Sequence, residues 1–141
     1  MNGTSELTIS SSLFEEISSH CIEGFPSEVV GILAGEKDTS NVLKVKPLVN
    51  ERSDTNNRYK VSGLVVYRAT QDLEAQGFDI LGYYHSHPNH SSQYSEYDKE
   101  HALPNLSYVI ISVVNGDVDT VQSWLLAEDR TRMFEQSVRI I

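Results

Sequence analysis

The chain has 141 residues, 39% hydrophobic and 22% charged, which is enough for one globular domain with one core. Its 20 acidic and 11 basic residues give a formal net charge of -9, which argues against nucleic acid or an anionic membrane surface as the main partner. The single cysteine, Cys21, excludes an internal disulfide and a zinc site built from cysteines.

The N-terminal residues contain no basic segment followed by an apolar one, so no signal peptide is predicted. No apolar run approaches the roughly 20 residues that a membrane span needs. A cytoplasmic protein without a membrane partner is therefore expected. The sequence does not decide the oligomeric state, and a homodimer is one possibility.

The first elements predicted are a short edge strand at residues 7–10 and a helix after it. Ser12 and Glu15 match a capping box, S-x-x-E, and would start that helix. Gly24 and Pro26 would end it. The apolar positions at helical spacing are Phe14, Ile17 and Cys21.

Strands are predicted next. The apolar run EVVGILAGE at residues 28–36 is typical of a buried strand, and residues 41–51 alternate in part like a second one. Residues 52–57 form a polar turn, and residues 58–62 a short strand.

In the second half, Ser62 is expected to cap a helix that ends at Gly77 and carries Val66, Ala69 and Leu73. Residues 78–86 return as a strand, and Ser95 opens a short helix before Pro104. Residues 106–114 and 118–128 flank an Asn-Gly-Asp turn and predict a hairpin. The tail from Arg130 fits a strand or a helix. Interleaved strands and helices predict an α/β domain with a mixed sheet, spanning residues 1–141.

The stretch HSHPNHSSQYSEYD, residues 85–98, carries the candidate chemistry. His85 and His87 are two apart, so on a strand both imidazoles point to one face. Pro88 would end the strand. Asp98 lies one turn into the next helix, where its carboxylate can serve as a third ligand. Two imidazoles and one carboxylate leave a fourth tetrahedral position open, the layout of catalytic zinc.

Such a site lowers the pKa of its water to about 7 and needs a base to move the proton. Glu28, at the start of an apolar strand, is the candidate, although a glutamate at such a position is more often a solvated strand end. Ser95 and Asp98 also match a helix N-terminal box, S-x-x-D, and the two readings are compatible because the cap would orient the ligand.

Other polar and aromatic residues receive plainer interpretations. Ser86 faces away from the histidines and is expected to pack or to donate a supporting hydrogen bond. His90 and His101 do not match the ligand spacing and are expected to be exposed, as is His20 on the first helix. Trp124 is expected in the core or a groove wall.

The pattern E…H-S-H-P-x6-S-x-x-D, from Glu28 through His85, His87 and Ser95 to Asp98, resembles the signature of the JAMM metallopeptidases, also called MPN+ or JAB domains. PSEVVGILAG, DILGYYHSHP and SEYDKEHALPNLSYVIISV resemble the small prokaryotic branch, which includes peptidases of sulfur-carrier proteins such as the CysO-cysteine peptidase. The resemblance implies a curved mixed sheet flanked by helices, similar to cytidine deaminases.

The resemblance also implies roles for single residues. His85, His87 and Asp98 would bind Zn²⁺, Glu28 would act as general acid and base, and Ser95 would donate a hydrogen bond to the developing oxyanion. The bond cut would follow the C-terminal Gly-Gly of a ubiquitin-like or sulfur-carrier protein, whose extended tail could add as a strand beside the groove.

One departure from the family pattern concerns the leaving group. Only eight residues, 99–106, separate Asp98 from Ser107, where the eukaryotic deubiquitinating members carry a larger insertion. This favours a small or loosely held leaving group over linkage-specific cleavage of polyubiquitin. Residues 52–60 correspond to a family region that often contacts the ubiquitin-like tail.

Three functions compete. The first is a zinc peptidase that cuts after the Gly-Gly of a sulfur carrier. The second is an isopeptidase that removes a ubiquitin-like modifier from target lysines. The third is a non-catalytic binding scaffold, which the complete ligand set disfavours. A zinc nucleoside deaminase is disfavoured because the chain lacks H-x-E with P-C-x-x-C. A RadC-like protein is disfavoured by the serine between the histidines.

Overall fold

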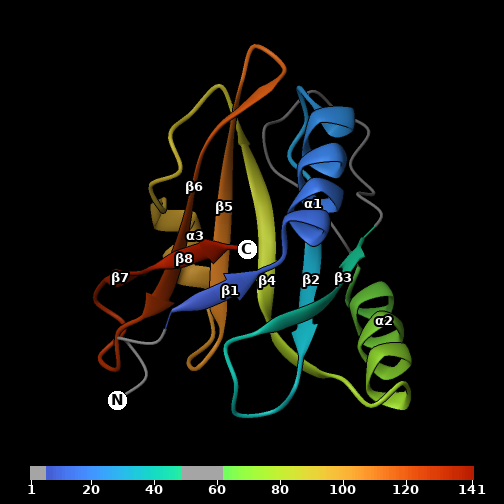
Figure 1. Cartoon of the computed structure of the whole chain (residues 1–141). Coiled ribbons are helices and arrows are strands. Elements are labelled where there is room, and N and C mark those ends of the chain that lie inside the picture. The colour runs from blue at the N-terminus through green and yellow to red at the C-terminus, as the bar shows by residue number, and fades with distance from the viewer. Residues whose placement is uncertain (1–5, 49–61) are drawn as a thin grey trace.

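The computed structural model describes residues 6–48 and 62–141, and they form strands interleaved with helices, followed by a run of strands at the C-terminal end (Figure 1). The strands are β1 (Leu7–Ile9), β2 (Val30–Gly35), β3 (Val42–Pro47), β4 (Asp79–Pro88), β5 (Ser107–Val114), β6 (Asp117–Leu126), β7 (Met133–Gln136) and β8 (Val138–Ile140). The helices are α1 (Ser11–Gly24), α2 (Gly63–Ala75) and α3 (Glu96–His101). The predicted turn at residues 52–57, and the predicted strand at 58–62 apart from Ser62, lie outside the described residues.

Six strands form one sheet in the order β3-β2-β4-β5-β6-β7. β4 and β5 are parallel, and the other neighbours are antiparallel, so the sheet is mixed as predicted. Because β4 and β5 are parallel, the chain must cross from one end of the sheet to the other between them, and α3 lies on this crossover. β1 and β8 form a separate parallel pair.

Both faces of the sheet are covered, which explains why β2 is apolar along its whole length. On one face, Ile17 and Cys21 of α1 pack in a core cluster with Leu33, Tyr84 and Val109. On the other face, the buried side of α2 packs against β2, and Ala102, after α3, lies in a cluster with Ile110 and Trp124. The alternation along β4 thus turns Tyr84 toward α1, and His85 away from it.

The predicted start of α1 is wrong by two residues. Its N-cap is Ser10, whose hydroxyl accepts from the backbone N of Leu13 at 3.2 Å, so Ser12 is already helical and its box with Glu15 does not start the helix. Ser10 has the extended backbone of a cap because it directly follows β1. The predicted cap of α2 is confirmed, since Ser62 accepts from the backbone N of Val65 at 3.2 Å.

The remaining expectations concern strand bounds. β2 begins at Val30, so Glu28 precedes the strand instead of starting it. The predicted hairpin is confirmed as β5 and β6, and Asn115 and Gly116 at its turn both have positive φ, of 53° and 87°. The tail, which fitted either a strand or a helix, forms β7 and β8.

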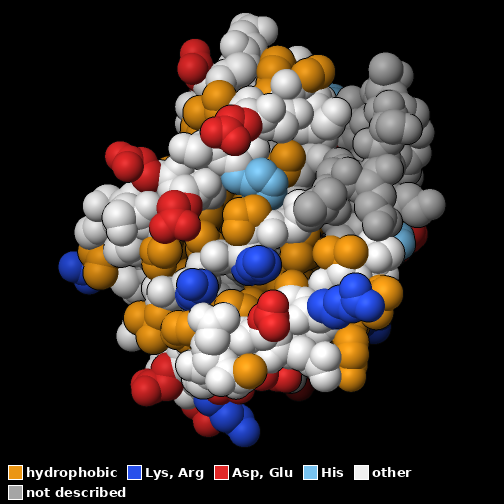
Figure 2. Space-filling model, turned by 90° about the vertical axis from the view of Figure 1, so that its right-hand side faces the viewer, with side chains coloured by type: hydrophobic (Ala, Val, Ile, Leu, Met, Phe, Trp, Pro, Cys, Tyr) orange, Lys and Arg blue, Asp and Glu red, His pale blue; other side chains and the backbone are white. Residues whose placement is uncertain are grey.

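The surface beside α2 and β3 carries exposed apolar groups. Three apolar side chains here are more than half exposed: Leu43 of β3 at 56%, and Leu64 and Tyr67 of α2 at 55% and 58%. Figure 2 shows this side of the molecule, with Lys, Arg, Asp and Glu side chains lying between hydrophobic ones. This side therefore carries both signs of charge, despite the net charge of -9. None of the helices in the described residues is long and apolar enough to span a membrane.

Candidate metal centre

The end of β4 brings His85 and His87 together, as their spacing predicts. Both imidazoles lie on the face away from α1, and their Nε2 atoms are 3.3 Å apart. The two residues are buried, with exposed fractions of 3% and 8%. In the register of the sheet they lie beside Ile110 and Ser112 of β5, which is a central strand. Both histidines are therefore held against β5, and His85 also pairs with Val30 of β2.

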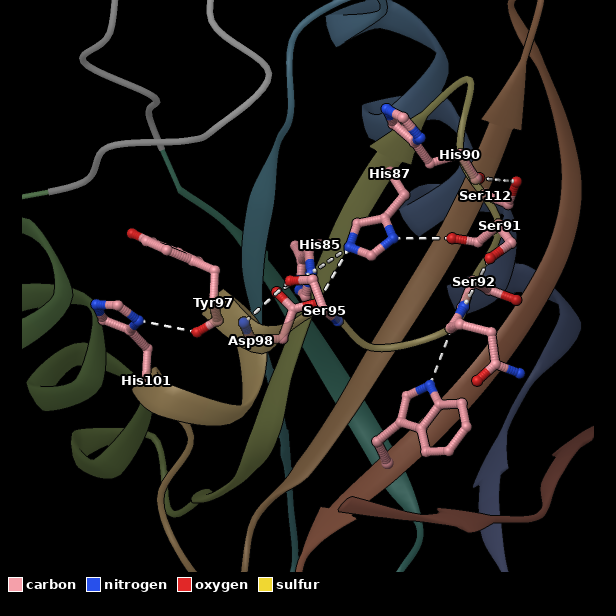
Figure 3. Close-up of polar contacts among 12 residues, drawn as sticks. His85, His87, His90, Ser91, Ser92, Ser95, Tyr97, Asp98, His101 and Ser112 are labelled. Carbon is pink, nitrogen blue, oxygen red and sulfur yellow. Dashed lines mark hydrogen bonds and ion pairs between the residues drawn. The ribbon is translucent and has the colours of Figure 1, made fainter. Parts of the chain in front are cut away.

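Asp98 reaches the histidines from α3 (Figure 3). Its Oδ1 lies 3.1 Å from Nε2 of His85, and its Oδ2 lies 3.1 Å from Nε2 of His87. The predicted capping box orients this carboxylate: the Ser95 backbone N donates to Asp98 Oδ2 at 2.8 Å, and the Asp98 backbone N donates to Ser95 Oγ at 3.1 Å. The cap and the ligand geometry therefore coexist, as expected.

The polar atoms of the three residues lie close enough together to surround one metal ion. The two Nε2 atoms are 3.3 Å apart, and each lies 3.1 Å from a different oxygen of the Asp98 carboxylate. Ligands about 2.0–2.1 Å from a tetrahedral zinc ion lie about 3.3 Å from one another. His85, His87 and Asp98 are the group in the described residues whose ligand atoms converge in this way. The donor set thus fits a metal ion with one position left over.

A backbone carbonyl sets the tautomer of His87. Its Nδ1 donates to the carbonyl O of Ser91 at 2.8 Å, so the lone pair of the neutral ring lies on Nε2, the atom that faces Asp98. Outer hydrogen bonds of this kind orient the imidazoles of metal sites and raise their basicity. The ring is thus already oriented for a ligand role.

The cluster attracts positive charge. Burial of the Asp98 carboxyl opposes ionisation, but hydrogen bonds from the two histidines outweigh it and hold the Asp98 pKa well below its usual range. Burial likewise opposes protonation of His87, but its hydrogen bonds to Asp98 and to the Ser91 carbonyl raise the pKa of the imidazole. The nearby Glu28 carboxylate adds to this rise. A cation, either a proton or a metal ion, is stabilised at this point.

Glu28 and Ser95 line the same cleft as His87 and Asp98, with a volume of about 480 Å³. Glu28 is half-buried, and the backbone after it is fixed to β4. The Val29 backbone N donates to Ser86 Oγ at 3.0 Å, and the Ser86 backbone N donates to the Val29 carbonyl at 3.1 Å. Ser86 faces away from the histidines, as predicted, and its hydrogen bond places the segment that bears Glu28.

The other histidines divide into two groups. His90 and His101 are exposed, as predicted, and His101 stacks on Tyr97 instead of joining the cluster. The expectation that His20 is exposed is wrong. His20 is half-buried, and its Nδ1 lies 2.6 Å from the hydroxyl of Tyr84. A contact across 64 residues has no local signal that could reveal it.

The sequence of this chain matches a known protein family. A sequence model of the family described as prokaryotic homologs of the JAB domain matches residues 10–127. The chain belongs to this family. "Desampylase" of Haloferax volcanii is 32% identical over 114 residues, covering 77% of this chain and 82% of the relative. The "Probable TtuB-protein conjugate cleaving protease" of Thermus thermophilus is 32% identical over 116 residues, covering 82% and 73%.

Solved structures of other proteins agree with the fold. The chain is similar to protein DSY2949 of Desulfitobacterium hafniense, with a TM-score of 0.81, 27% identity, and coverage of 96% and 92%. It also shares its fold with AF2198, a JAB1/MPN domain protein of Archaeoglobus fulgidus, with a TM-score of 0.57, 19% identity, and coverage of 94% and 99%. The expected JAMM/MPN family and its mixed α/β fold are therefore confirmed.

Proposed function

We propose that this chain is a zinc metallopeptidase that hydrolyses the bond after the C-terminal Gly-Gly of a ubiquitin-like or sulfur-carrier protein. The observation that carries the proposal is the convergence of His85, His87 and Asp98, next to a cleft that Glu28 and Ser95 line. Two relatives at 32% identity support it, because one is a desampylase and the other is named as a protease of TtuB–protein conjugates.

His85, His87 and Asp98 would hold the ion through two nitrogens and one oxygen. Zinc suits this mixed ligand set and, when bound, supplies a Lewis acid that lowers the pKa of a water molecule. Burial of all three side chains excludes competing solvent ligands from the protein side of the site.

Glu28 is assigned the proton transfers. In the reaction, water adds to the carbonyl carbon of the terminal glycine, and the C–N bond to the leaving group breaks. The Glu28 carboxylate accepts the proton of the water and delivers it to the leaving nitrogen, which departs as a neutral amine. Glu28 lines the same cleft as His87 and Asp98, which this role requires.

Ser95 is assigned the stabilisation of the oxyanion. Its oxygen already accepts from the Asp98 backbone N, so its O–H proton is left to donate elsewhere. The side chain is exposed at the cleft, where the carbonyl oxygen of a substrate would gain charge. A fixed donor aimed at developing charge is worth about 10²–10³ in turnover rate.

The leaving group distinguishes the two enzyme candidates. α3 ends at His101 and β5 begins at Ser107, so the connection between them is short, as expected, and offers little area to hold a second folded protein. The name of the Thermus relative nevertheless describes cleavage of a protein conjugate. A deconjugating isopeptidase that grips the ubiquitin-like side and tolerates many leaving groups satisfies both observations.

The test uses one ubiquitin-like protein with a C-terminal Gly-Gly in two forms. One is joined through an isopeptide bond to a lysine of a second protein, and the other is extended by a single residue. Mass spectrometry of reactions with zinc-loaded enzyme should show cleavage of the first form directly after the second glycine, abolished by a chelator and restored by zinc. Cleavage of the second form alone would assign a sulfur-carrier peptidase, and cleavage of neither would contradict the proposal.

A further inference from the structure

The loop between β4 and α3 is fixed to the hairpin of β5 and β6 by a series of hydrogen bonds. At its start, the Asn89 backbone N donates to the Val113 carbonyl at 2.6 Å, and the Asn115 backbone N donates to the Asn89 side chain at 3.0 Å. The Ser112 hydroxyl then donates to the His90 carbonyl. These contacts attach the first part of the loop to β5.

Ser92 attaches the second part of the loop to β6. This serine is 1% exposed, and its hydroxyl donates to Gln122 Oε1 at 2.7 Å. Because its one proton is used there, the Thr120 hydroxyl donates to Ser92 Oγ, at 2.8 Å. The indole Nε1 of Trp124 donates to the Ser92 carbonyl at 2.9 Å. Three alternate residues of one strand face thus converge on one loop residue.

The anchors determine where the Ser91 carbonyl lies. The carbonyls of His90 and Ser92 are bound to side chains of β5 and β6, whereas the carbonyl of Ser91, between them, accepts from Nδ1 of His87 (Figure 3). Peptide groups are planar, so fixing the residue on each side restricts rotation of the group between them. The chain of contacts therefore runs from Trp124 through the loop to the His87 ring.

We infer that Trp124 and Ser92 are positioning residues, which hold the Ser91 carbonyl so that His87 presents Nε2 to a metal ion. The inference rests on the proposed metal site. Neither side chain lines the cleft with Glu28, so both act through the loop and not on a substrate. Loss of the hydrogen bond that orients a ligand imidazole changes metal affinity by about 10- to 100-fold, so displacement of the Ser91 carbonyl should weaken metal binding.

The direct test is the zinc affinity of the full chain, measured by competition with a chromophoric chelator. Trp124→Phe removes the indole N–H donor. It keeps an aromatic ring beside Tyr94, which packs edge-on against the indole in the wild type. Ser92→Ala removes the hydroxyl that Thr120 and Gln122 hold. Leu126→Val is the matched control, because Leu126 lies in the same core cluster as Trp124 and makes none of these hydrogen bonds.

Both Trp124→Phe and Ser92→Ala should weaken zinc binding about tenfold or more, and should change the visible absorption bands of the Co²⁺-substituted site. Leu126→Val should lower the melting temperature while keeping the zinc affinity within about twofold, because a purely structural perturbation does not rotate His87. Unchanged zinc affinity in both Trp124→Phe and Ser92→Ala, or an equal loss of affinity in Leu126→Val, would overturn this inference and leave the proposed function standing. A wild-type chain that binds no zinc would instead overturn the proposed function on which the inference rests.

Discussion

At the scale of single residues, Ser95 combines two tasks that different substitutions can separate. Its oxygen caps α3 by accepting from the Asp98 backbone N, and its proton is assigned to the oxyanion. Aspartate is as good an N-cap as serine but has no proton to donate when ionised. Threonine keeps both functions. Substitution of this residue therefore distinguishes a structural cap from a catalytic donor.

Ser95→Asp should keep the melting temperature close to that of the wild type and reduce turnover about 10²–10³-fold. Ser95→Thr should keep most of the activity, whereas Ser95→Ala should lose both turnover and about 0.5–2 kcal/mol of stability. Steady-state kinetics and thermal melts on the three variants test this. A Ser95→Asp variant with wild-type turnover would show that Ser95 is only a cap.

At the scale of elements, β4 shows both what its sequence predicts and what it cannot. The alternation in DILGYYHSHP places both histidines on one face, and Pro88 ends the strand as expected. The packing of β4 against β5 was not predictable, because it depends on Gly82 opposite Ser107, which lies far along the chain. The cap of α1 at Ser10 was missed for a related reason. Only Ser12 has a glutamate three residues later, and the end of β1, which places the cap at Ser10, is not visible in that local pattern.

Gly82→Ala should destabilise the element that carries the histidines. A Cβ at Gly82 would lie 1.9 Å from the carbonyl O of Ser107, so the parallel strands would have to separate. A loss of at least about 1–3 kcal/mol in the free energy of unfolding is expected, as for overpacked cores. Gly63→Ala, at the start of α2 with no atom within 4 Å, should change it by less than about 1 kcal/mol. Urea unfolding of both variants measures this, and equal stabilities would contradict the packing described for β4.

At the scale of the whole molecule, the order of strands is the part of the fold that the sequence did not reveal. The single α/β fold, α2 and the hairpin follow from local patterns, but β8 pairs with β1 at the opposite end of the described chain. The candidate site likewise has a part that local sequence patterns predict and a part that they do not. The histidines, Asp98 and the capping box carry local spacing, whereas the contact of Trp124 with Ser92 spans 32 residues and has no such signal.

The stability of the whole fold should depend on pH through His20, which connects α1 to the central strand β4. Burial outweighs the attraction of Glu23 and lowers the pKa of His20 below its usual 6.5. Below about pH 6.5 the unfolded chain therefore binds the proton more readily, and the folded state loses stability as the pH falls. Between about pH 8 and pH 5, the free energy of unfolding should fall more for the wild type than for His20→Gln. Parallel curves for the two proteins, from urea unfolding at each pH, would exclude this role.

Glu28 is proposed to move the proton in a metal-dependent hydrolysis, and the variant Glu28→Gln tests this role directly. Glu28→Gln keeps the size and polarity of the side chain but removes its basicity. Zinc content should be measured by elemental analysis, and cleavage of a Gly-Gly conjugate by mass spectrometry, on the same samples. Both proteins should contain one zinc ion per chain, and only the wild type should cleave the conjugate. Full activity in Glu28→Gln, with zinc bound, would contradict this role.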